Sequence, residues 1–241
     1  MRRKRIEHTV TKDAEGQRIY EIAGLGPLRL RSVTGTIGIL NKRYLNLHRE
    51  RLGTEAADRE RDETSEIGRM VHDSIKRLCG GKPYGDYEWR RLGYPLPKND
   101  EVVADERVRN GVRAYKRFKN ETGYEPVVAE LFVYSLMYGL AGTADNIGLL
   151  PRDGKKLLAI LDWKTGDDLY DEVWMQLSAY AVGFAECYGR YPDLVLPVRL
   201  DRTTGLPVYG KGMVQREYLE AFTAFRGLQR AADWLEQMRA N

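Results

Sequence analysis

Two aspartates and one lysine are the residues of this chain whose types and spacing best suit catalysis. Asp145 precedes an Asp153-Gly154 turn and Asp162 and Lys164 follow it, with apolar, strand-like residues on both flanks. An Asp-Gly turn between apolar runs is typical of a β-hairpin. Side chains alternate along a strand, so Asp162 and Lys164 share one face. If Asp145 faces the same side, the hairpin gathers two carboxylates and an ammonium group in one patch.

Crowded carboxylates repel each other unless a cation lies between them. A hard divalent ion with oxygen ligands, such as Mg²⁺, is the natural occupant of this patch. Lys164 could then orient a water molecule beside the ion and stabilise developing negative charge. An Asp-x-Lys triplet on an exposed strand is usually only solvated surface. The nearly continuous apolar run from Leu157 to Leu161 instead predicts a buried strand, in which charges need a partner or a function.

Strands and helices alternate on both sides of the hairpin. Apolar periodicity predicts strands over 127–138, 194–200 and 207–209, and helices over 102–119, 174–188 and 217–238. Another predicted helix carries Ile67, Val71, Ile75 and Leu78 and ends at Gly80-Gly81. Periodicity alone therefore predicts an α/β or α+β protein.

The part of the chain before these elements gives weaker signals. A basic segment leads into a predicted hairpin around Gly24-Leu25-Gly26-Pro27. Thr34 or Thr36 could cap a helix with an apolar stripe at Ile37, Leu40, Tyr44 and Leu47. The charged segment 50–63 continues helically or loops outward, and segment 83–97, rich in Pro, Gly and Tyr, predicts a surface loop.

Four short motifs follow one another along the chain. They are Gly68-x-x-x-His72, Gly142-x-x-Asp145, Asp162-x-Lys164 and Gln176-x-x-x-Tyr180. Each recurs by chance, but four in order with fitting local structure form a specific pattern. In this order they resemble the PD-(D/E)XK nuclease superfamily, in particular its RecB-like and phage-type exonuclease branch. The resemblance runs roughly from Ser32 to Val208, and the use of aspartate at 162 instead of glutamate is common in that branch.

The resemblance implies an α/β fold with a restriction-endonuclease-like core, in which a mixed central β-sheet is flanked by helices. It implies a single PD-(D/E)XK nuclease domain over residues 1–241. In that domain, 1–31 form the N-terminal basic segment and hairpin, 32–210 the core, and 211–241 the C-terminal helix.

The resemblance also implies metal-dependent hydrolysis of phosphodiester bonds. Asp145, Asp162 and the main-chain carbonyl of Trp163 would hold one or two Mg²⁺ or Mn²⁺ ions, and Lys164 would help to orient the attacking water. His72 is either a further metal ligand or a half-exposed helix histidine. Residues expected to bind substrate or support the site are Gln176, Tyr180, Glu130, Thr165 and Glu66.

Several supporting residues also have purely structural explanations. Tyr180 and Trp163 are also ordinary core residues, and a surface salt bridge explains Glu130 nearly as well as a place in the site. Glu66 precedes His72 by six residues and does not share its helix face well, so it is a weak alternative ligand. Thr165 could contact a phosphate.

The implied substrate is DNA. The four motifs favour an exonuclease that acts at DNA ends in recombination, repair or phage replication. A structure-selective endonuclease and a non-catalytic DNA-binding module that keeps the nuclease fold remain alternatives. A recombination or single-strand-annealing protein could be a partner, and an oligomer is possible.

Composition limits other classes of function. The net charge of +4 is mild, and among the basic clusters the stretch from Arg107 to Lys119 is the best candidate for a phosphate-facing surface. The only cysteines, Cys79 and Cys187, cannot supply a four-cysteine iron–sulfur cluster. There is no Walker loop, dinucleotide fingerprint or Ser-His-Asp elbow. No apolar run reaches transmembrane length, so we expect an intracellular protein without membrane association. The resemblance implies a cytoplasmic location in a bacterium or a phage-infected host.

Overall fold

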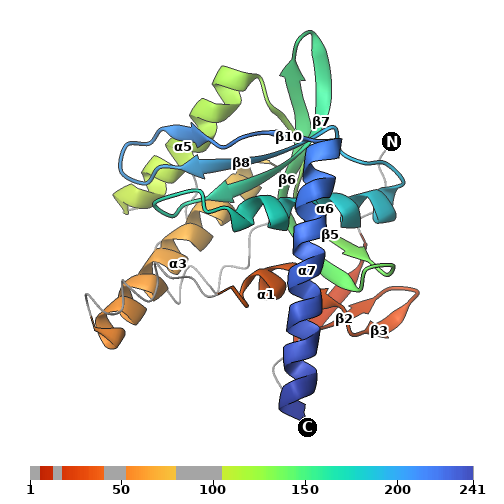
Figure 1. Ribbon diagram of the computed structural model, residues 1–241. Helices are drawn as coiled ribbons and strands as arrows, with labels where there is room; N and C mark the ends of the chain where they lie inside the picture. Colours follow the sequence, from red (N-terminus) through yellow and green to blue (C-terminus); the bar gives the residue numbers. More distant parts are fainter. Residues whose placement is uncertain (1–5, 13–17, 41–52, 80–104, 241) are drawn as a thin grey trace.

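A mixed β-sheet with helices on both faces forms the centre of the computed structural model, which describes residues 6–12, 18–40, 53–79 and 105–240 (Figure 1). This arrangement confirms the predicted α/β fold with a restriction-endonuclease-like core. Within the described residues the sheet has seven strands, in the order β10-β8-β7-β6-β4, with β5 also paired to β6 and β9 to β8. The predicted loop at 83–97 and two residues of a predicted helix, Tyr44 and Leu47, lie outside the described residues.

The predicted hairpin forms the middle of the sheet. It consists of β6 (Leu140–Arg152) and β7 (Lys155–Lys164), which pair antiparallel. Asp153 and Gly154 between them both have positive φ angles, of 49° and 71°. Two positive φ angles match the right-handed twist of the flanking strands, which is why Asp-Gly suits this turn.

The other strands extend the sheet on either side of the hairpin. They are β4 (Arg31–Ser32), β5 (Glu125–Ser135), β8 (Leu194–Leu200), β9 (Pro207–Tyr209) and β10 (Met213–Val214). β8 is parallel to β7, and helix α6 (Glu172–Tyr188) makes the crossover that a parallel pair needs. β5 ends at Ser135 and not at Tyr138 as predicted, because a turn occupies the residues before β6.

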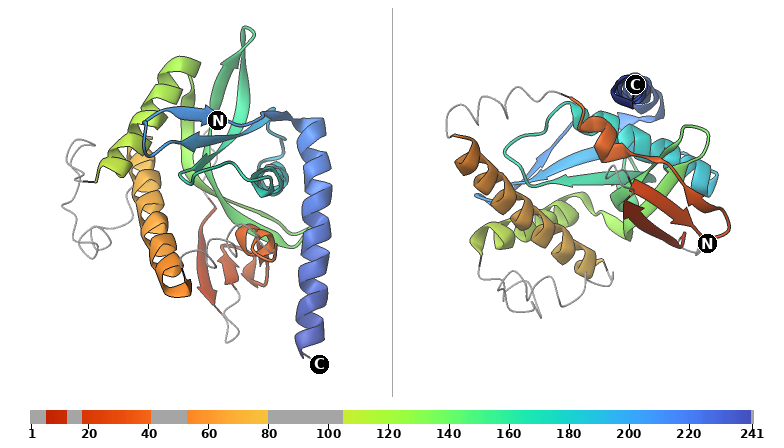
Figure 2. Two further views of the ribbon diagram at one scale, coloured as in Figure 1. Left: turned by 60° about the vertical axis from the view of Figure 1, so that its left-hand side comes forward. Right: turned by 90° about the horizontal axis from the view of Figure 1, so that it is seen from below.

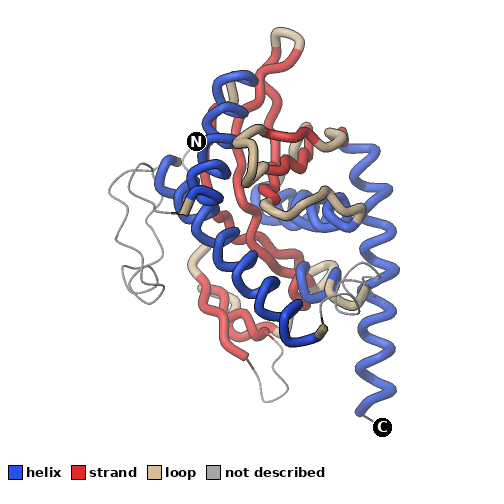
Figure 3. The backbone as a smooth tube through the Cα atoms, turned by 90° about the vertical axis from the view of Figure 1, so that its left-hand side faces the viewer, coloured by secondary structure: helices blue, strands red, loops and turns tan. Residues whose placement is uncertain are grey.

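Two groups of helices cover the two faces of the sheet (Figures 1 and 2). On one face α6 packs with α1 (Val33–Ile37) and α7 (Gln215–Ala240), and their apolar side chains form one core cluster. On the other face α3 (Thr54–Leu78) and α5 (Glu106–Thr122) bury a second cluster that includes Trp163. The tube view shows α3 running obliquely along this face (Figure 3). None of the described helices is both long and apolar enough to cross a membrane.

A small separate sheet precedes the core. It contains β1 (His8–Lys12), β2 (Arg18–Ile22) and β3 (Gly26–Leu28). The β2–β3 hairpin is the predicted one, whereas β1 was not predicted. The side chains of Tyr20 and Ile22 pack against Phe132 of β5, which attaches the small sheet to the central one.

Several helix boundaries differ from the sequence prediction. Ser32, and neither Thr34 nor Thr36, caps α1: its hydroxyl accepts a hydrogen bond from the amide of Gly35. Ser32 is the last residue of β4 and has extended geometry, so the helix begins where the strand ends. Helix α3 begins at Thr54, so the helical alternative holds for the described part of the charged segment.

Candidate active site

The candidate catalytic residues gather where β6 and β7 stop pairing. The last pair in register is Asn146 with Leu161, and the same register would next bring Asp145 opposite Asp162. At this point Asp145 Oδ2 instead accepts a hydrogen bond from the main-chain amide of Trp163, at 2.9 Å. The carboxylate of Asp145 therefore bridges the diverging strands and lies beside the end of β7 that carries Asp162 and Lys164.

Helix α3 brings His72 to the same point. Its Nε2 lies 3.0 Å from the carbonyl oxygen of Trp163, and its Nδ1 lies 3.7 Å from Asp145 Oδ2 and 4.0 Å from Glu130 Oε1. One ligand atom from each of His72, Glu130 and Asp145 lies within 4.8 Å of the others. The three side chains are 25%, 16% and 14% exposed, so this group remains within reach of solvent.

Glu130 reaches this group from an unusual backbone conformation. Its φ angle is +52°, in the left-handed region, although it lies inside strand β5. Its neighbours Ala129 and Leu131 pair regularly with Asn146 and Ala144, on either side of Asp145. A non-glycine residue in this region carries strain of about 1–3 kcal/mol. A strained residue among candidate metal ligands is typical of a functional site. Glu130 was predicted as a supporting residue, but its backbone conformation was not.

Asp162 belongs to a second, more deeply buried set of contacts. Lys164 Nζ lies 2.6 Å from Asp162 Oδ2, and Gln176 Nε2 donates to Asp162 Oδ1 at 2.9 Å. The same amide nitrogen is 3.2 Å from the Tyr180 hydroxyl, while Gln176 Oε1 accepts from Lys164 Nζ at 3.2 Å. Gln176 thus holds the acid, the lysine and the tyrosine in one network.

Burial dominates the electrostatics of this second set. It raises the pKa of Asp162 to about 6; Lys164 opposes the shift and Asp145 adds to it. Burial also lowers the pKa of Lys164, but the carboxylates of Asp162 and Asp145 outweigh it and the net shift is upward, so the ammonium group stays charged. Burial raises the pKa of Tyr180 well above its ordinary value, so its hydroxyl stays protonated.

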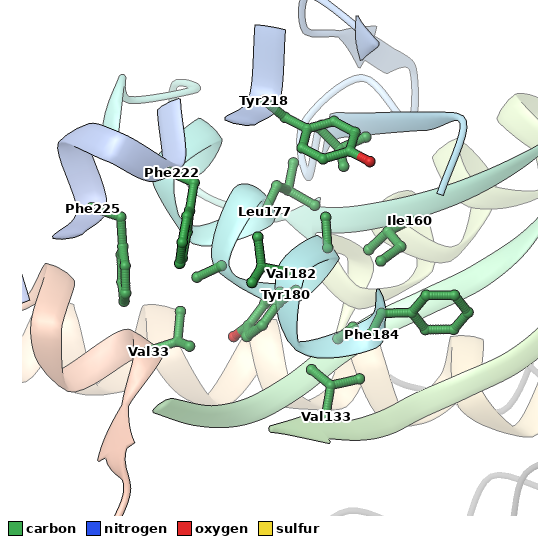
Figure 4. Close-up of a cluster of buried hydrophobic side chains, with 14 of the residues drawn as sticks. Val33, Val133, Ile160, Leu177, Tyr180, Val182, Phe184, Tyr218, Phe222 and Phe225 are labelled. Atoms are coloured by element: carbon green, nitrogen blue, oxygen red, sulfur yellow. The ribbon is translucent and has the colours of Figure 1, made fainter. Parts of the chain in front are cut away.

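The motif glycines make room for motif side chains. A Cβ atom at Gly142 would lie 2.7 Å from Tyr180 Cε1, and one at Gly68 would lie 2.9 Å from Thr165 Oγ1. Tyr180 itself projects from α6 among the apolar side chains near Val33 (Figure 4). Gly142 therefore lets the α6 ring approach β6, and Gly68 lets α3 approach the residue that follows Lys164.

Two other candidate residues, Trp163 and Glu66, have side chains that lie outside the site. The Trp163 ring is buried edge-on against Tyr115 and Phe118, so its side chain is core and only its backbone faces the site. Glu66 Oε1 lies 3.8 Å from Arg69, and Glu66 is not part of the metal-ligand group found among the described residues.

One buried contact set near the site was not predicted. Asn146 accepts a hydrogen bond from the Tyr124 hydroxyl at 2.5 Å, and its Nδ2 lies 3.4 Å from Cys79 Sγ at the end of α3. The residue is fully buried next to Asp145. A buried polar residue needs hydrogen-bond partners. The asparagine inside the apolar run of β6 could therefore have indicated this contact set from the sequence.

The predicted phosphate-facing stretch on α5 is partly neutralised. Arg107 pairs with Asp105 and Glu63, at 2.9 and 2.7 Å. Arg117 pairs with Glu121 at 2.6 Å. These ion pairs offset the charge of two of the arginines between Arg107 and Lys119.

The donor atoms fit a divalent ion. Carboxylate oxygens suit Mg²⁺ and Mn²⁺, and an imidazole nitrogen suits the softer ions of the first transition row. If His72 Nε2 carries the proton given to the Trp163 carbonyl, Nδ1 keeps a lone pair beside the two carboxylates.

Comparison with known proteins gives the family. The sequence model of the PD-(D/E)XK nuclease superfamily matches residues 42–240, and the chain belongs to this superfamily. No curated protein matches the sequence.

Solved structures show only distant similarity. An alkaline exonuclease (LHK-Exo) from Laribacter hongkongensis is 12% identical, with 87% of this chain and 92% of that chain covered and a TM-score of 0.33. LHK-Exo in complex with dAMP is 15% identical over 71% of this chain and 91% of that chain, with a TM-score of 0.32. The family membership rests on the sequence match alone.

Proposed function

We propose that this protein is a metal-dependent deoxyribonuclease that hydrolyses phosphodiester bonds at DNA ends, and that residues 1–241 form one nuclease domain. The observation that carries the proposal is the group formed by His72, Glu130 and Asp145, whose ligand atoms lie within 4.8 Å of one another. It adjoins the ion pair of Asp162 and Lys164 in a member of a nuclease superfamily.

The proposed metal ligands fall into two sets. His72, Glu130 and Asp145 would hold Mg²⁺ or Mn²⁺. Asp162 and the Trp163 carbonyl stay candidate ligands. Asp162 pairs with Lys164 and accepts a hydrogen bond from Gln176, and the Trp163 carbonyl oxygen contacts His72. A metal ion would have to replace these contacts. A bound ion would supply Lewis-acid stabilisation of the charge on phosphate oxygens and a lowered pKa for bound water.

Lys164 and Gln176 have roles that follow from their own contacts. Lys164 keeps its positive charge and lies at the edge of the buried set, with its side chain 33% exposed. Its ammonium group can therefore donate to an incoming phosphate oxygen or to a water molecule beside it. Gln176 keeps Lys164 and Asp162 aligned, and Thr165 adjoins them as a possible donor to phosphate.

The first experiment tests hydrolysis. End-labelled linear duplex DNA is incubated with the parent protein and with Asp145→Asn, with Mg²⁺, with Mn²⁺ and with EDTA. We expect the parent to release nucleotides only with metal, and Asp145→Asn to release none. Asp153→Asn is the matched control, because Asp153 lies at the tip of the same hairpin with a side chain 92% exposed, and it should act like the parent.

The second experiment separates the remaining functions. A closed circle of the same sequence is compared with the linear form. Degradation of the linear form alone supports the exonuclease favoured by the order of the four motifs, whereas cutting of the circle would show an endonuclease. Binding of DNA without cleavage in either metal would show a non-catalytic DNA-binding module.

A further inference from the structure

An arginine-lined cavity lies away from the candidate active site. It encloses about 370 Å³ between the small N-terminal sheet, the turn between β5 and β6, and helix α7. Gly139 lines it and precedes Asp145 by six residues, which along an extended strand is about 20 Å. Four arginines from three parts of the chain line this cavity: Arg18, Arg29, Arg31 and Arg226.

Arginines outnumber acids in the described lining of this cavity. Among the described residues, the acidic side chains that line it are Asp233 and Glu236, against four arginines. Both acids bind Arg31: Asp233 Oδ1 at 2.6 and 2.9 Å and the Glu236 oxygens at 2.6 and 2.8 Å. Arg31 is therefore occupied and serves to fasten α7 to β4. Within the part of the chain that the structure describes, Arg18 and Arg226 form no ion pair.

Arg226 is held so that part of its guanidinium group remains available. Its Nη1 donates to the Tyr138 carbonyl at 3.0 Å and to Gln229 Oε1 at 2.5 Å, and the group lies 5.1 Å from the centre of the Tyr138 ring. Among the described residues, its Nε and Nη2 have no hydrogen-bond acceptor. Arg18 likewise makes a single long contact in this part of the chain, from Nη1 to the Ser32 hydroxyl at 3.3 Å. Held guanidinium groups with unused donors suit phosphate oxygens.

We propose that this cavity is a second phosphate-binding site, in which Arg18 and Arg226 bind the phosphate oxygens. The family match begins at residue 42, so Arg18, Arg29 and Arg31 lie outside what superfamily membership accounts for. The phosphate is either a free monoester or inorganic ion, or a phosphodiester of a nucleic-acid strand. The site does not depend on the proposed nuclease activity.

Isothermal titration calorimetry in EDTA tests this proposal without cleavage. The probes are inorganic phosphate and a short single-stranded oligonucleotide without terminal phosphates. The variants are Arg18→Gln and Arg226→Gln, and the control is Arg216→Gln, an exposed residue on α7 outside the cavity. We expect both cavity variants to weaken binding severalfold and the control to bind like the parent. For the oligonucleotide, each cavity variant should also reduce the slope of log affinity against log salt by about 1.

The outcomes separate the two sources of phosphate. Loss for both probes, or for inorganic phosphate alone, supports a site that takes free phosphate; loss for the oligonucleotide alone supports a backbone contact. Parent-like binding of both probes by Arg18→Gln would overturn the proposal. This variant removes only one weak contact, so it remains informative if Arg226→Gln loses its thermal unfolding transition. Asp145→Asn should bind phosphate like the parent, so a failure of the nuclease proposal leaves this result intact.

Discussion

His72 Nε2 lies 3.0 Å from the main-chain oxygen of Trp163, 91 residues further along the chain. A carbonyl oxygen can only accept, so Nε2 carries the proton of this hydrogen bond. The other ring nitrogen then faces Asp145 and Glu130. An imidazole fixed through one nitrogen while the other faces carboxylates is the usual arrangement of a metal-binding histidine. The contact also ties the position of α3 to the end of β7.

His72→Ala should weaken Mn²⁺ binding, because it removes the only nitrogen donor of the group formed with Glu130 and Asp145. We expect a loss of at least about tenfold in affinity, as is common when a metal site loses a ligand or its support. Calorimetric titration with Mn²⁺ measures it. Glu55→Gln removes an exposed carboxylate from the first turn of the same helix and should bind Mn²⁺ like the parent. Equal affinities for all three proteins would exclude His72 as a ligand.

Asp162→Asn should change how stability depends on pH. Burial raises the pKa of Asp162 from 3.8 to about 6, so the folded state holds a proton that the unfolded state has lost. The free energy of unfolding of the parent therefore falls as the pH rises from about 4 to about 6. Asp162→Asn lacks the carboxyl group and should not show this decrease. The difference should reach about 3 kcal/mol above pH 6 in favour of the variant.

Urea unfolding in EDTA between pH 4 and pH 8 measures this difference. Asp153→Asn, at the exposed hairpin tip, should follow the parent curve. Parallel curves for the parent and Asp162→Asn would show that the buried carboxylate is not destabilised. The same shift predicts weaker metal binding below pH 6 if Asp162 is a ligand, because protons then compete for its oxygens.

Gly142→Ala should destabilise the fold and misplace Tyr180. The new methyl group would lie 2.7 Å from a carbon of a rigid, buried ring, so the ring or the strand must move. Overpacking of this kind costs about 1–3 kcal/mol in the free energy of unfolding. Gly227→Ala on α7 is the control, because nothing lies within 4 Å of its new methyl group. It should raise stability by up to about 1 kcal/mol through helix propensity, and a Gly142 variant as stable as the parent would contradict the packing described.

Tyr124→Phe should lower the free energy of unfolding although it keeps the aromatic ring. It leaves the Asn146 side-chain oxygen buried without its 2.5 Å partner. An unsatisfied buried acceptor costs about 1–3 kcal/mol, which urea unfolding detects. Tyr191→Phe supplies a comparison at an exposed tyrosine and should leave stability unchanged. If Tyr124→Phe behaves in the same way, the hydrogen bond makes no net contribution.

Local patterns predicted most elements of the fold. The Asp153-Gly154 turn, the apolar run before Asp162 and the glycines after α5 and α6 are signals carried by neighbouring residues. Local patterns do not predict the ends of helices and strands where tertiary contacts determine them. Ser32 caps α1 because a two-residue strand pairs with β6 just before it, and no local pattern indicates that pairing.

Tertiary contacts between distant segments set the arrangement of the candidate site. The motifs named His72, Asp145, Asp162 and Lys164, but sequence spacing could not show that Asp162 contacts Lys164 while His72 and Glu130 approach Asp145. Glu130 is the clearest example, because its positive φ angle depends on the way β5 bends beside β6. The ligand roles of these residues remain predictions.

The most direct test of a metal-dependent nuclease centred on Asp145 is the release of labelled nucleotides from linear duplex DNA by the parent protein and by Asp145→Asn, with Mn²⁺ or Mg²⁺ and with EDTA. We predict release by the parent with metal, none with EDTA, and none from Asp145→Asn in any condition. Equal release by the two proteins, or no release by the parent with either ion, would contradict the proposed function.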